Sequence, residues 1–171
     1  MQSGLEIAYL QEIELQCSLI ARAASRLDRE SEAADRDEIE IWTLVQTILA
    51  SAANLASALW GSHPDERRWL RRSLHLDESS SLRGLPRVIA ATPFSSRIEE
   101  WDATRVDNGF VGFRGRQIGD PDDPPSSHEW FQRFDATTGV LDLWGHRLDL
   151  AAIVREVHRI QPLARASGQA G

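Results

Sequence analysis

The sequence predicts a mainly α-helical protein, in which a helical bundle is followed by a small C-terminal β-hairpin and a closing helix. Two observations predict the bundle. Apolar residues recur every three or four positions over residues 4–28, and they occupy much more than one helix face over residues 36–60. A third observation predicts the hairpin, because "EWFQRF", "DATTG" and "VLDLW" place two short apolar runs on either side of a Gly-containing turn.

The first helix is expected over about residues 4–28. Its apolar residues form one stripe, which is the pattern of a helix that buries a single face. The stripe consists of Leu5, Tyr9, Ile13, Cys17, Ile20, Ala24 and Leu27. Because Cys17 is the only cysteine, the chain has no internal disulfide and no cysteine-rich zinc site. We expect a buried thiol there and a reducing compartment.

The second helix is expected over about residues 36–60, after the charged segment "DRESEAADRD" interrupts the apolar pattern. Asp35, with Glu38 three residues later, is a candidate cap for its first turn. Because apolar residues surround this helix, we expect it at the centre of the bundle. Gly61 and Pro64 are expected to end it.

Beyond residue 61 the expected helices are shorter. We expect a third helix within "PDERRWLRRSLHL", a brief helical piece at 81–91, and a further helix that starts after Pro93. Residues 109–127 are rich in glycine and proline and are expected to form a loop and not a strand. Asp149 is a candidate cap for a last helix that Pro162 stops.

These boundaries predict one domain with a small appendage, which suits a chain of 171 residues. We expect the helical bundle over residues 1–108 and the Gly/Pro-rich loop over 109–127. A hairpin plus helix, packed on the bundle, is expected over 128–163, because an isolated hairpin is only marginally stable in water. Residues 164–171 are expected to be disordered.

Charge and hydropathy exclude several classes of partner. The chain has 19 basic and 26 acidic residues and a formal net charge of −7, which disfavours non-specific binding to nucleic-acid phosphates or anionic lipids. The first residues lack the basic and apolar segments of a secretion signal, and no apolar run approaches the roughly 18 residues that cross a bilayer. We therefore expect a cytoplasmic protein that does not bind membranes.

Four segments of the chain together resemble a group of bacterial HEPN-like helical proteins. The segments are "IWTLVQTILASAANLASALWG", "LDESSSLRGL", "FSSRIEEW" and "QRFDATTGVLDLWGHRLDLAAIVREV", and the resemblance covers roughly residues 38–163. It implies a helical bundle that usually dimerises. Active HEPN proteins cut RNA without a metal ion, and in them an arginine stabilises charge on the phosphate while a nearby histidine transfers a proton.

The chain departs from that family in the catalytic helix, which reads approximately Arg-Asn-x-x-Glu-His-Phe-Asp-x-Arg-Leu-Asp-x-Trp. Aligning "FSSRIEEW" with the second half of this pattern leaves none of the four polar positions of its first half intact. They are occupied by Val88, Ile89, Thr92 and Pro93. Arg87 is one residue away from the arginine position, and a shift of one residue turns a side chain by about 100° on a helix. The resemblance therefore implies an emptied catalytic site.

The segment "RRWLRRSLHL" is a second place where the same chemistry is conceivable. On a helix, Arg68, Arg72 and His75 share one face, so a relocated ribonuclease site is one interpretation of this segment. The other is a solvated helix face whose charge is neutralised by neighbouring acidic residues. The catalytic candidates are thus Arg68, Arg72, His75 and Arg87, all of them secondary to an interpretation with no catalytic residue.

The same segment holds the candidates for partner binding. An exposed Trp69 between Arg67 and Arg71 would suit a protein partner or a stacked base. The remaining histidines have no helix-turn spacing to one another or to the cysteine, so no metal site and no cofactor are expected.

The favoured hypothesis is a non-catalytic HEPN-like scaffold or interaction protein, which forms a homodimer or binds a bacterial protein partner through its bundle face. The alternative is a metal-independent HEPN ribonuclease with a relocated Arg/His site. A third hypothesis is a small-ligand pocket covered by the 109–127 loop and the hairpin. Nucleic acid is the less favoured partner because of the acidic net charge.

Overall fold

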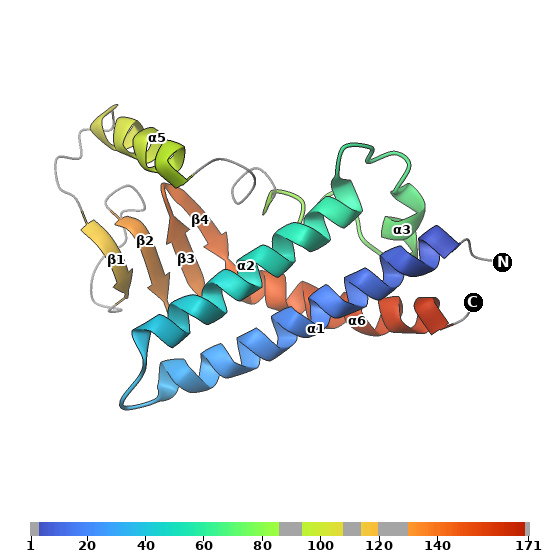
Figure 1. Ribbon diagram of the computed structural model, residues 1–171, viewed down its shortest axis with the longest axis horizontal. Coiled ribbons are helices and arrows are strands. Elements are labelled where there is room, and N and C mark those ends of the chain that lie inside the picture. The colour runs from blue at the N-terminus through green and yellow to red at the C-terminus, as the bar shows by residue number, and fades with distance from the viewer. Residues whose placement is uncertain (1–3, 86–93, 108–113, 120–129, 170–171) are drawn as a thin grey trace. The chain divides into compact units, whose positions relative to one another are not determined.

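A computed structural model of the chain describes residues 4–85, 94–107, 114–119 and 130–169, which are mainly α-helical (Figure 1). The predicted fold class is therefore confirmed. The chain divides into two compact units: residues 1–90 with 152–171, called here the helical unit, and residues 91–151, called here the sheet unit. These boundaries differ from the expected ones at residues 108, 127 and 163, because the helix that follows Pro93 belongs to the sheet unit and the last helix belongs to the helical unit.

Each unit has its own secondary-structure elements. The helical unit contains α1 (Gly4–Glu32), α2 (Glu38–Trp60), α3 (Arg68–Ser73) and all but the first two residues of α6 (Leu150–Gln169). The sheet unit contains α5 (Phe94–Asp107), β1 (Arg114–Ile118), β2 (Trp130–Asp135), β3 (Val140–Leu143) and β4 (His146–Asp149). Within the brief helical piece expected at 81–91, residues 81–84 form a turn, residue 85 is helical, and the part from residue 86 lies outside the described residues.

The core of the helical unit lies between α1, α2 and α6. A connection of five residues, 33–37, joins α1 to α2 in a helical hairpin, as Figure 1 shows. Both helices contribute fully buried apolar side chains; these include Leu10, Ile13, Cys17, Ile20, Ile41, Val45, Ile48, Ala52, Leu55 and Leu59. Burying each large aliphatic side chain contributes about 1.5–3 kcal/mol to folding. The position of α2 in the core is the one its apolar pattern predicted.

Leu5 is an exception to the predicted stripe of α1. It is 69% exposed, whereas Ile13 and Cys17 are completely buried. A step of four residues exceeds one helical turn by about 40°, because each residue turns the helix by about 100°. Three such steps from Leu5 to Cys17 rotate the side chain by about 120°, so the two residues face different surroundings.

Cys17 is a free, buried thiol, as the sequence predicted. Burial raises its pKa to about 12, and the nearby negative charge of Glu14 acts in the same direction. The residue therefore packs as a small apolar side chain in the core, and its thiolate is not formed at neutral pH.

The two ends of α2 are capped by different groups. Asp37 is the N-cap, and its carboxylate accepts hydrogen bonds from the backbone N–H groups of Ile39 and Glu40. The expected cap at Asp35 was therefore wrong, because the residue with extended backbone geometry next to the first turn is Asp37. At the other end, Gly61 N–H donates to Ser57 O, and a Cβ on Gly61 would come within 2.5 Å of that oxygen, so only glycine fits.

The composition of α2 also meets the test for a membrane span. Among the described residues it is the one helix long and apolar enough to cross a bilayer. However, 56% of its apolar window is buried inside the protein, as is usual for the core helix of a bundle.

The last helix continues beyond its predicted end. Pro162 lies inside α6, and residues 164–169 are helical, so the expected stop at Pro162 and the expected disorder of these residues were wrong. Proline removes one backbone hydrogen bond from a helix. Contacts with α1 compensate: Ala164 is buried, Arg165 Nε donates to Glu14 Oε1 at 2.7 Å, and Gln161 Nε2 donates to Ser18 Oγ at 3.0 Å.

The predicted hairpin is confirmed, but it is part of a larger sheet with the strand order β1-β2-β3-β4. In the hairpin, Phe134 pairs with Leu141 and Gln132 with Leu143. Gly139 has a φ of +68° in the turn, where the Asp135 carboxylate accepts hydrogen bonds from the backbone N–H groups of Thr137 and Thr138. A third antiparallel strand, β4, pairs with β3.

The strand β1 corrects the expectation that residues 109–127 contain no strand. Arg114–Ile118 pairs in parallel with β2, with Ile118 opposite Phe134. The segment RGRQI contains a single apolar residue and therefore has no strand periodicity. It is a strand because its backbone groups pair with those of β2, which would otherwise present unpaired N–H and C=O groups at the edge of the sheet.

The helix α5 contributes aromatic contacts within the sheet unit. Trp101 is buried with its ring 5.5 Å from the ring of Phe131, in an edge-to-face arrangement, and Phe131 lies 5.9 Å from Trp144. The guanidinium of Arg97 lies 4.7 Å above the Trp144 ring. These contacts explain why α5 belongs with the sheet and not with the bundle.

Candidate functional site

Arg71, one of the expected partner-binding residues, holds the C-terminal end of α2 instead. Its side chain is buried, with 8% of the residue exposed. One nitrogen, Nη1, donates to Leu59 O at 2.7 Å and to Pro64 O at 2.8 Å. Leu59 O is one of the last carbonyls of α2, which have no partner within the helix, so the charge-assisted hydrogen bond from Arg71 satisfies it. The guanidinium also lies 5.8 Å from the Trp60 ring.

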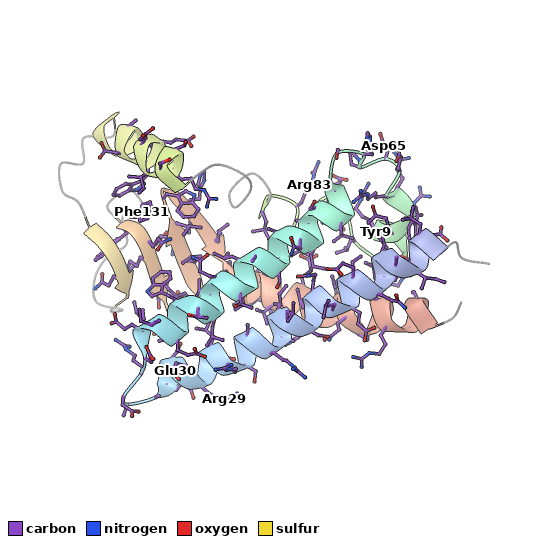
Figure 2. The ribbon with its side chains drawn as sticks, in the orientation of Figure 1. Tyr9, Arg29, Glu30, Asp65, Arg83 and Phe131 are labelled. Carbon is purple, nitrogen blue, oxygen red and sulfur yellow. The ribbon has the colours of Figure 1, made fainter. Side chains whose placement is uncertain are left out.

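Arg67 also donates hydrogen bonds to the C-terminal end of α2. Its Nη1 donates to Ser57 O at 2.9 Å and to Ala58 O at 2.8 Å. Its guanidinium lies 4.7 Å above the ring of Tyr9 on α1, which Figure 2 shows next to α3. Arg67 therefore ties α3 to both α1 and α2.

These contacts give the arginine-rich segment a structural role. Arg67 and Arg71 are committed to main-chain carbonyls and aromatic rings, and Trp69 between them is partly buried. The three residues expected to form a partner surface therefore do not form an exposed cluster. The sequence pattern identified the cluster of arginines, but it could not predict the main-chain carbonyl groups to which Arg67 and Arg71 donate.

The relocated catalytic site requires Arg68, Arg72 and His75 on one helix face, and the helix ends before His75. The α3 helix stops at Ser73, and His75 has a φ of +52°, the left-handed conformation. Two hydrogen bonds close the helix there: Leu76 N–H donates to Arg71 O at 2.8 Å, and His75 N–H donates to Arg72 O at 3.1 Å. Because glycine usually occupies this closing position, His75 is there with some backbone strain.

The two arginines of that candidate site lie on α3, which does not extend to His75. Arg68 forms an exposed ion pair with Asp65, at 2.6 Å from Nη2 to Oδ1, and Arg72 is exposed. The fourth catalytic candidate, Arg87, lies outside the described residues, as do Val88, Ile89, Thr92 and Pro93, which occupy the emptied positions.

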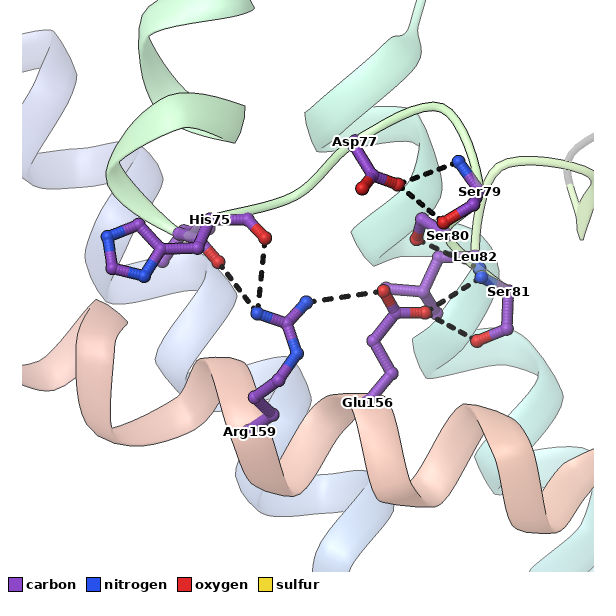
Figure 3. A network of polar contacts seen from close by, with 9 residues as sticks. His75, Asp77, Ser79, Ser80, Ser81, Leu82, Glu156 and Arg159 are labelled. Carbon is purple, nitrogen blue, oxygen red and sulfur yellow. Dashed lines mark hydrogen bonds and ion pairs between the residues drawn. The ribbon is translucent and has the colours of Figure 1, made fainter.

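His75 instead borders a polar pocket between the segment 75–81 and α6. The pocket has a volume of about 490 Å³, and Figure 3 shows the polar contacts among several of its lining residues. Arg159 Nη1 donates to the backbone carbonyls of Leu74 and His75, and Arg159 Nη2 lies 3.5 Å from Glu156 Oε1. The Glu156 carboxylate in turn accepts hydrogen bonds from the backbone N–H and the hydroxyl of Ser81.

The carboxylates of this pocket are held by its own residues. The hydroxyl and the backbone N–H of Ser79 donate to Asp77 Oδ1, and these bonds lower the pKa of Asp77, with a further contribution from the charge of Arg159. Among the residues that the structure describes, no group of three His, Cys, Asp or Glu side chains could hold a metal ion. The arrangement anchors the serine-rich segment to α6 through the hydrogen bonds of Ser81 to Glu156.

The sheet unit contains a polar row that the sequence did not predict. Cross-strand pairing places Gln117, Arg133, Asp142 and Arg147 side by side across β1, β2, β3 and β4. Arg133 is 3% exposed and Asp142 is 2% exposed. A Cβ on Gly119 would lie within 3.1 Å of the Arg133 guanidinium, so this glycine leaves space for the buried charge.

The electrostatics of Asp142 are unusual for a carboxylate. Burial raises its pKa above the ordinary value, and the positive charges of Arg147 and Arg133 oppose that shift without cancelling it. Asp142 Oδ1 and Gln117 Oε1 are buried, and no donor among the described residues reaches either atom. Buried acceptors in this state cost folding free energy, and a perturbed carboxylate is one mark of a functional site.

A signal for the row is present in the sequence. Arg133 lies within "WFQRF" and Asp142 within "VLDLW", so each is a charged residue inside an otherwise apolar strand. Such a residue is usually paired or functional when its strand is buried on both faces. Strand alternation alone would have assigned both to a solvent-facing surface.

The chain was compared with protein-family models, curated proteins and solved structures, and none of them matches it.

The role of Arg71 predicts a large asymmetry between adjacent arginines. We expect Arg71→Ala to lower the free energy of unfolding by about 2 kcal/mol, because Leu59 O at the end of α2 and Pro64 O in the following connection lose this donor. Arg72→Ala, one residue away on the exposed side of α3, should change it by no more than about 0.5 kcal/mol. The midpoints of urea unfolding measure both values. Equal effects of the two substitutions would contradict a capping role for Arg71.

The raised pKa of Asp142 predicts a pH dependence of stability. Its contribution is fully present below the unfolded value of 3.8 and is lost as the pH rises through the folded pKa. Lowering the pH from 7 towards 4 should therefore stabilise the wild-type protein relative to Asp142→Asn, measured as the difference in free energy of unfolding.

Asp135→Asn is a control with the opposite sign. Burial opposes ionisation of Asp135, but hydrogen bonds from Thr138 and Thr137 outweigh it and lower the pKa. Its contribution is present above the unfolded pKa and is lost as the pH falls, so the wild-type protein should lose stability relative to Asp135→Asn on acidification. The same trend for both variants would refute the assignment for Asp142.

Proposed function

We propose that this chain is a non-catalytic, HEPN-like interaction protein that binds a protein partner, or a second copy of itself, through the exposed face of α1. One observation carries the proposal. Leu5, Leu15 and Leu19 on α1 are 69%, 52% and 39% exposed, although the opposite side of the same helix supplies the core. A helix that displays leucines on both sides is typical of one that packs against two neighbours, of which the described residues supply one.

We propose a protein without catalytic activity for two reasons: the residues that replace the HEPN catalytic residues, and the contacts that the arginines of the α3 segment make. Val88, Ile89, Thr92 and Pro93 replace the polar residues of the HEPN catalytic helix. Arg67 and Arg71 are occupied by the end of α2, and Arg68 and Arg72 do not meet His75 on a helix face. The acidic net charge of −7 also favours a protein partner over nucleic acid.

The proposal predicts that association depends on the leucines of α1. We expect the purified protein to be larger than a monomer, or to retain a partner, in light scattering at micromolar concentration. Leu15→Glu combined with Leu19→Glu should weaken that association by at least about tenfold, because the contact would bury two carboxylates. The matched control is Ile39→Glu, at the exposed start of α2, where the side chain is 71% exposed.

Two results would contradict this proposal. One is a strict monomer that retains no partner. The other is association that the two α1 substitutions and the Ile39→Glu control weaken equally, because the contact would then not depend on α1.

The alternative function, a ribonuclease with a relocated Arg/His site, makes a separate prediction. Under our proposal, neither the wild-type protein nor His75→Ala cleaves mixed RNA, because α3 ends before His75 and Arg159, the arginine next to His75, is bound to two backbone carbonyls and to Glu156. The measurement is gel analysis of RNA incubated with protein purified in parallel. Cleavage that His75→Ala abolishes would overturn the non-catalytic assignment and establish the alternative.

A further inference from the structure

The exposed face of α1 has a regular spacing that extends beyond the three leucines. Exposed residues follow one another at alternating steps of three and four along most of the helix. They are Leu5, Ala8, Glu12, Leu15, Leu19, Arg22, Arg26 and Arg29, called here the α1 seam. This is the heptad spacing by which one helix faces another in a coiled coil. The seam spans about 36 Å along the helix at 1.5 Å per residue.

The charges of the seam are separated along its length. Residues 4–21 contain no lysine or arginine and include Glu12 on the seam. The C-terminal part of the seam consists of Arg22, Arg26 and Arg29. Leu15 and Leu19 lie between the acidic and basic parts, so the seam has an apolar centre with opposite charges on its two sides.

From this pattern we infer that the α1 seam pairs with the α1 seam of a second copy in antiparallel orientation, about a two-fold axis at the level of Cys17. In this register Leu15 faces Leu19 of the second copy, and Glu12 faces Arg22 of the second copy. Ala8 then meets the stem of Arg26, and Leu5 meets the stem of Arg29, where long aliphatic stems can cover apolar surface. Each contact occurs twice, as a two-fold interface requires.

The parallel arrangement of the same seam is unfavourable. It would place Glu12 against Glu12 and each of the three seam arginines against its own copy, and like charges in direct opposition are destabilising. In the antiparallel register the residues beside the centre, Gln11 and Ser25, are uncharged and add no repulsion. The helix dipoles of the two copies also oppose each other favourably.

A groove next to the seam offers space for the second helix. It lies between the C-terminal half of α1 and the first half of α2 and has a volume of about 630 Å³. Its lining includes Leu19, Arg22, Arg26 and Arg29 from the seam, and Glu40, Thr43 and Thr47 from α2. The antiparallel register places the N-terminal half of the second α1, which has no basic residue, against these arginines.

This inference rests on the proposed function, because it names the partner and the orientation for the same face of α1. Its test uses charge reversal in the full-length chain. Glu12→Arg alone or Arg22→Glu alone opposes like charges in both copies of the contact, so each should raise the dimer dissociation constant at least about tenfold. The double variant E12R/R22E restores opposite charges and should return the constant to within about threefold of the wild-type value.

Asp28→Arg is the matched control, since it reverses an exposed charge on α1 outside the seam. It should leave the dissociation constant unchanged. Analytical ultracentrifugation over a concentration series measures all four variants and the wild-type protein.

Cysteine cross-linking tests the orientation directly. When Leu5→Cys protein is mixed with Arg29→Cys protein under oxidising conditions, the antiparallel register predicts a disulfide between the two variants and none between two Leu5→Cys chains. The native Cys17 is completely buried and does not interfere.

The possible failures are distinguishable. A dimer that ignores the charge reversals, or that cross-links through two Leu5→Cys chains, would overturn the antiparallel pairing and leave an interaction protein. A monomer would also overturn it. If that monomer binds another protein in a manner that depends on Leu15 and Leu19, the proposed function stands without self-association; if it binds nothing, both fail.

Discussion

The end of α2 is the constraint on which the arrangement of the helical unit depends. The last carbonyl groups of a helix have no partner within it. The guanidinium groups of Arg67 and Arg71 donate to three of them in α2, Ser57 O, Ala58 O and Leu59 O, and to Pro64 O in the connection to α3. Because each arginine makes two bonds, the short α3 helix is held against α2 without a long apolar face of its own. Arg71 is thereby buried and Arg67 partly buried, whereas Arg68 and Arg72 remain exposed.

Side chains also bind main-chain groups where the serine-rich segment meets α6. Arg159 binds the carbonyls that follow α3, and Glu156 binds the backbone and hydroxyl of Ser81. Side chains one turn apart on α6 therefore complete the hydrogen bonding of a segment that has little regular structure. The polar pocket beside them is a consequence of this anchoring, and its charges are balanced internally.

The two faces of α1 link the fold to the proposed function. One face supplies the core through residues such as Ile13, Cys17 and Ile20, and it is continuous with the burial of α2 and α6. The other carries the heptad seam, with leucines at its centre and charges of opposite sign on either side. Apolar burial against a partner would supply affinity, and the separated charges would select orientation, since charge complementarity contributes more to specificity than to affinity.

The sequence by itself determined the helical class, the bounds of α1 and α2 within a few residues, the hairpin turn and the buried Cys17. Each of these follows from local periodicity, from turn chemistry or from the position of a residue within one stripe. It did not determine β1, whose strand exists through pairing with β2, or the passage of α6 through Pro162, which contacts with α1 stabilise. It also could not assign the arginines of α3, the row of Arg133 and Asp142, or the exposure of Leu5. Periodicity identifies which residues share a face, whereas only the tertiary structure decides which distant carbonyl, carboxylate or helix that face meets.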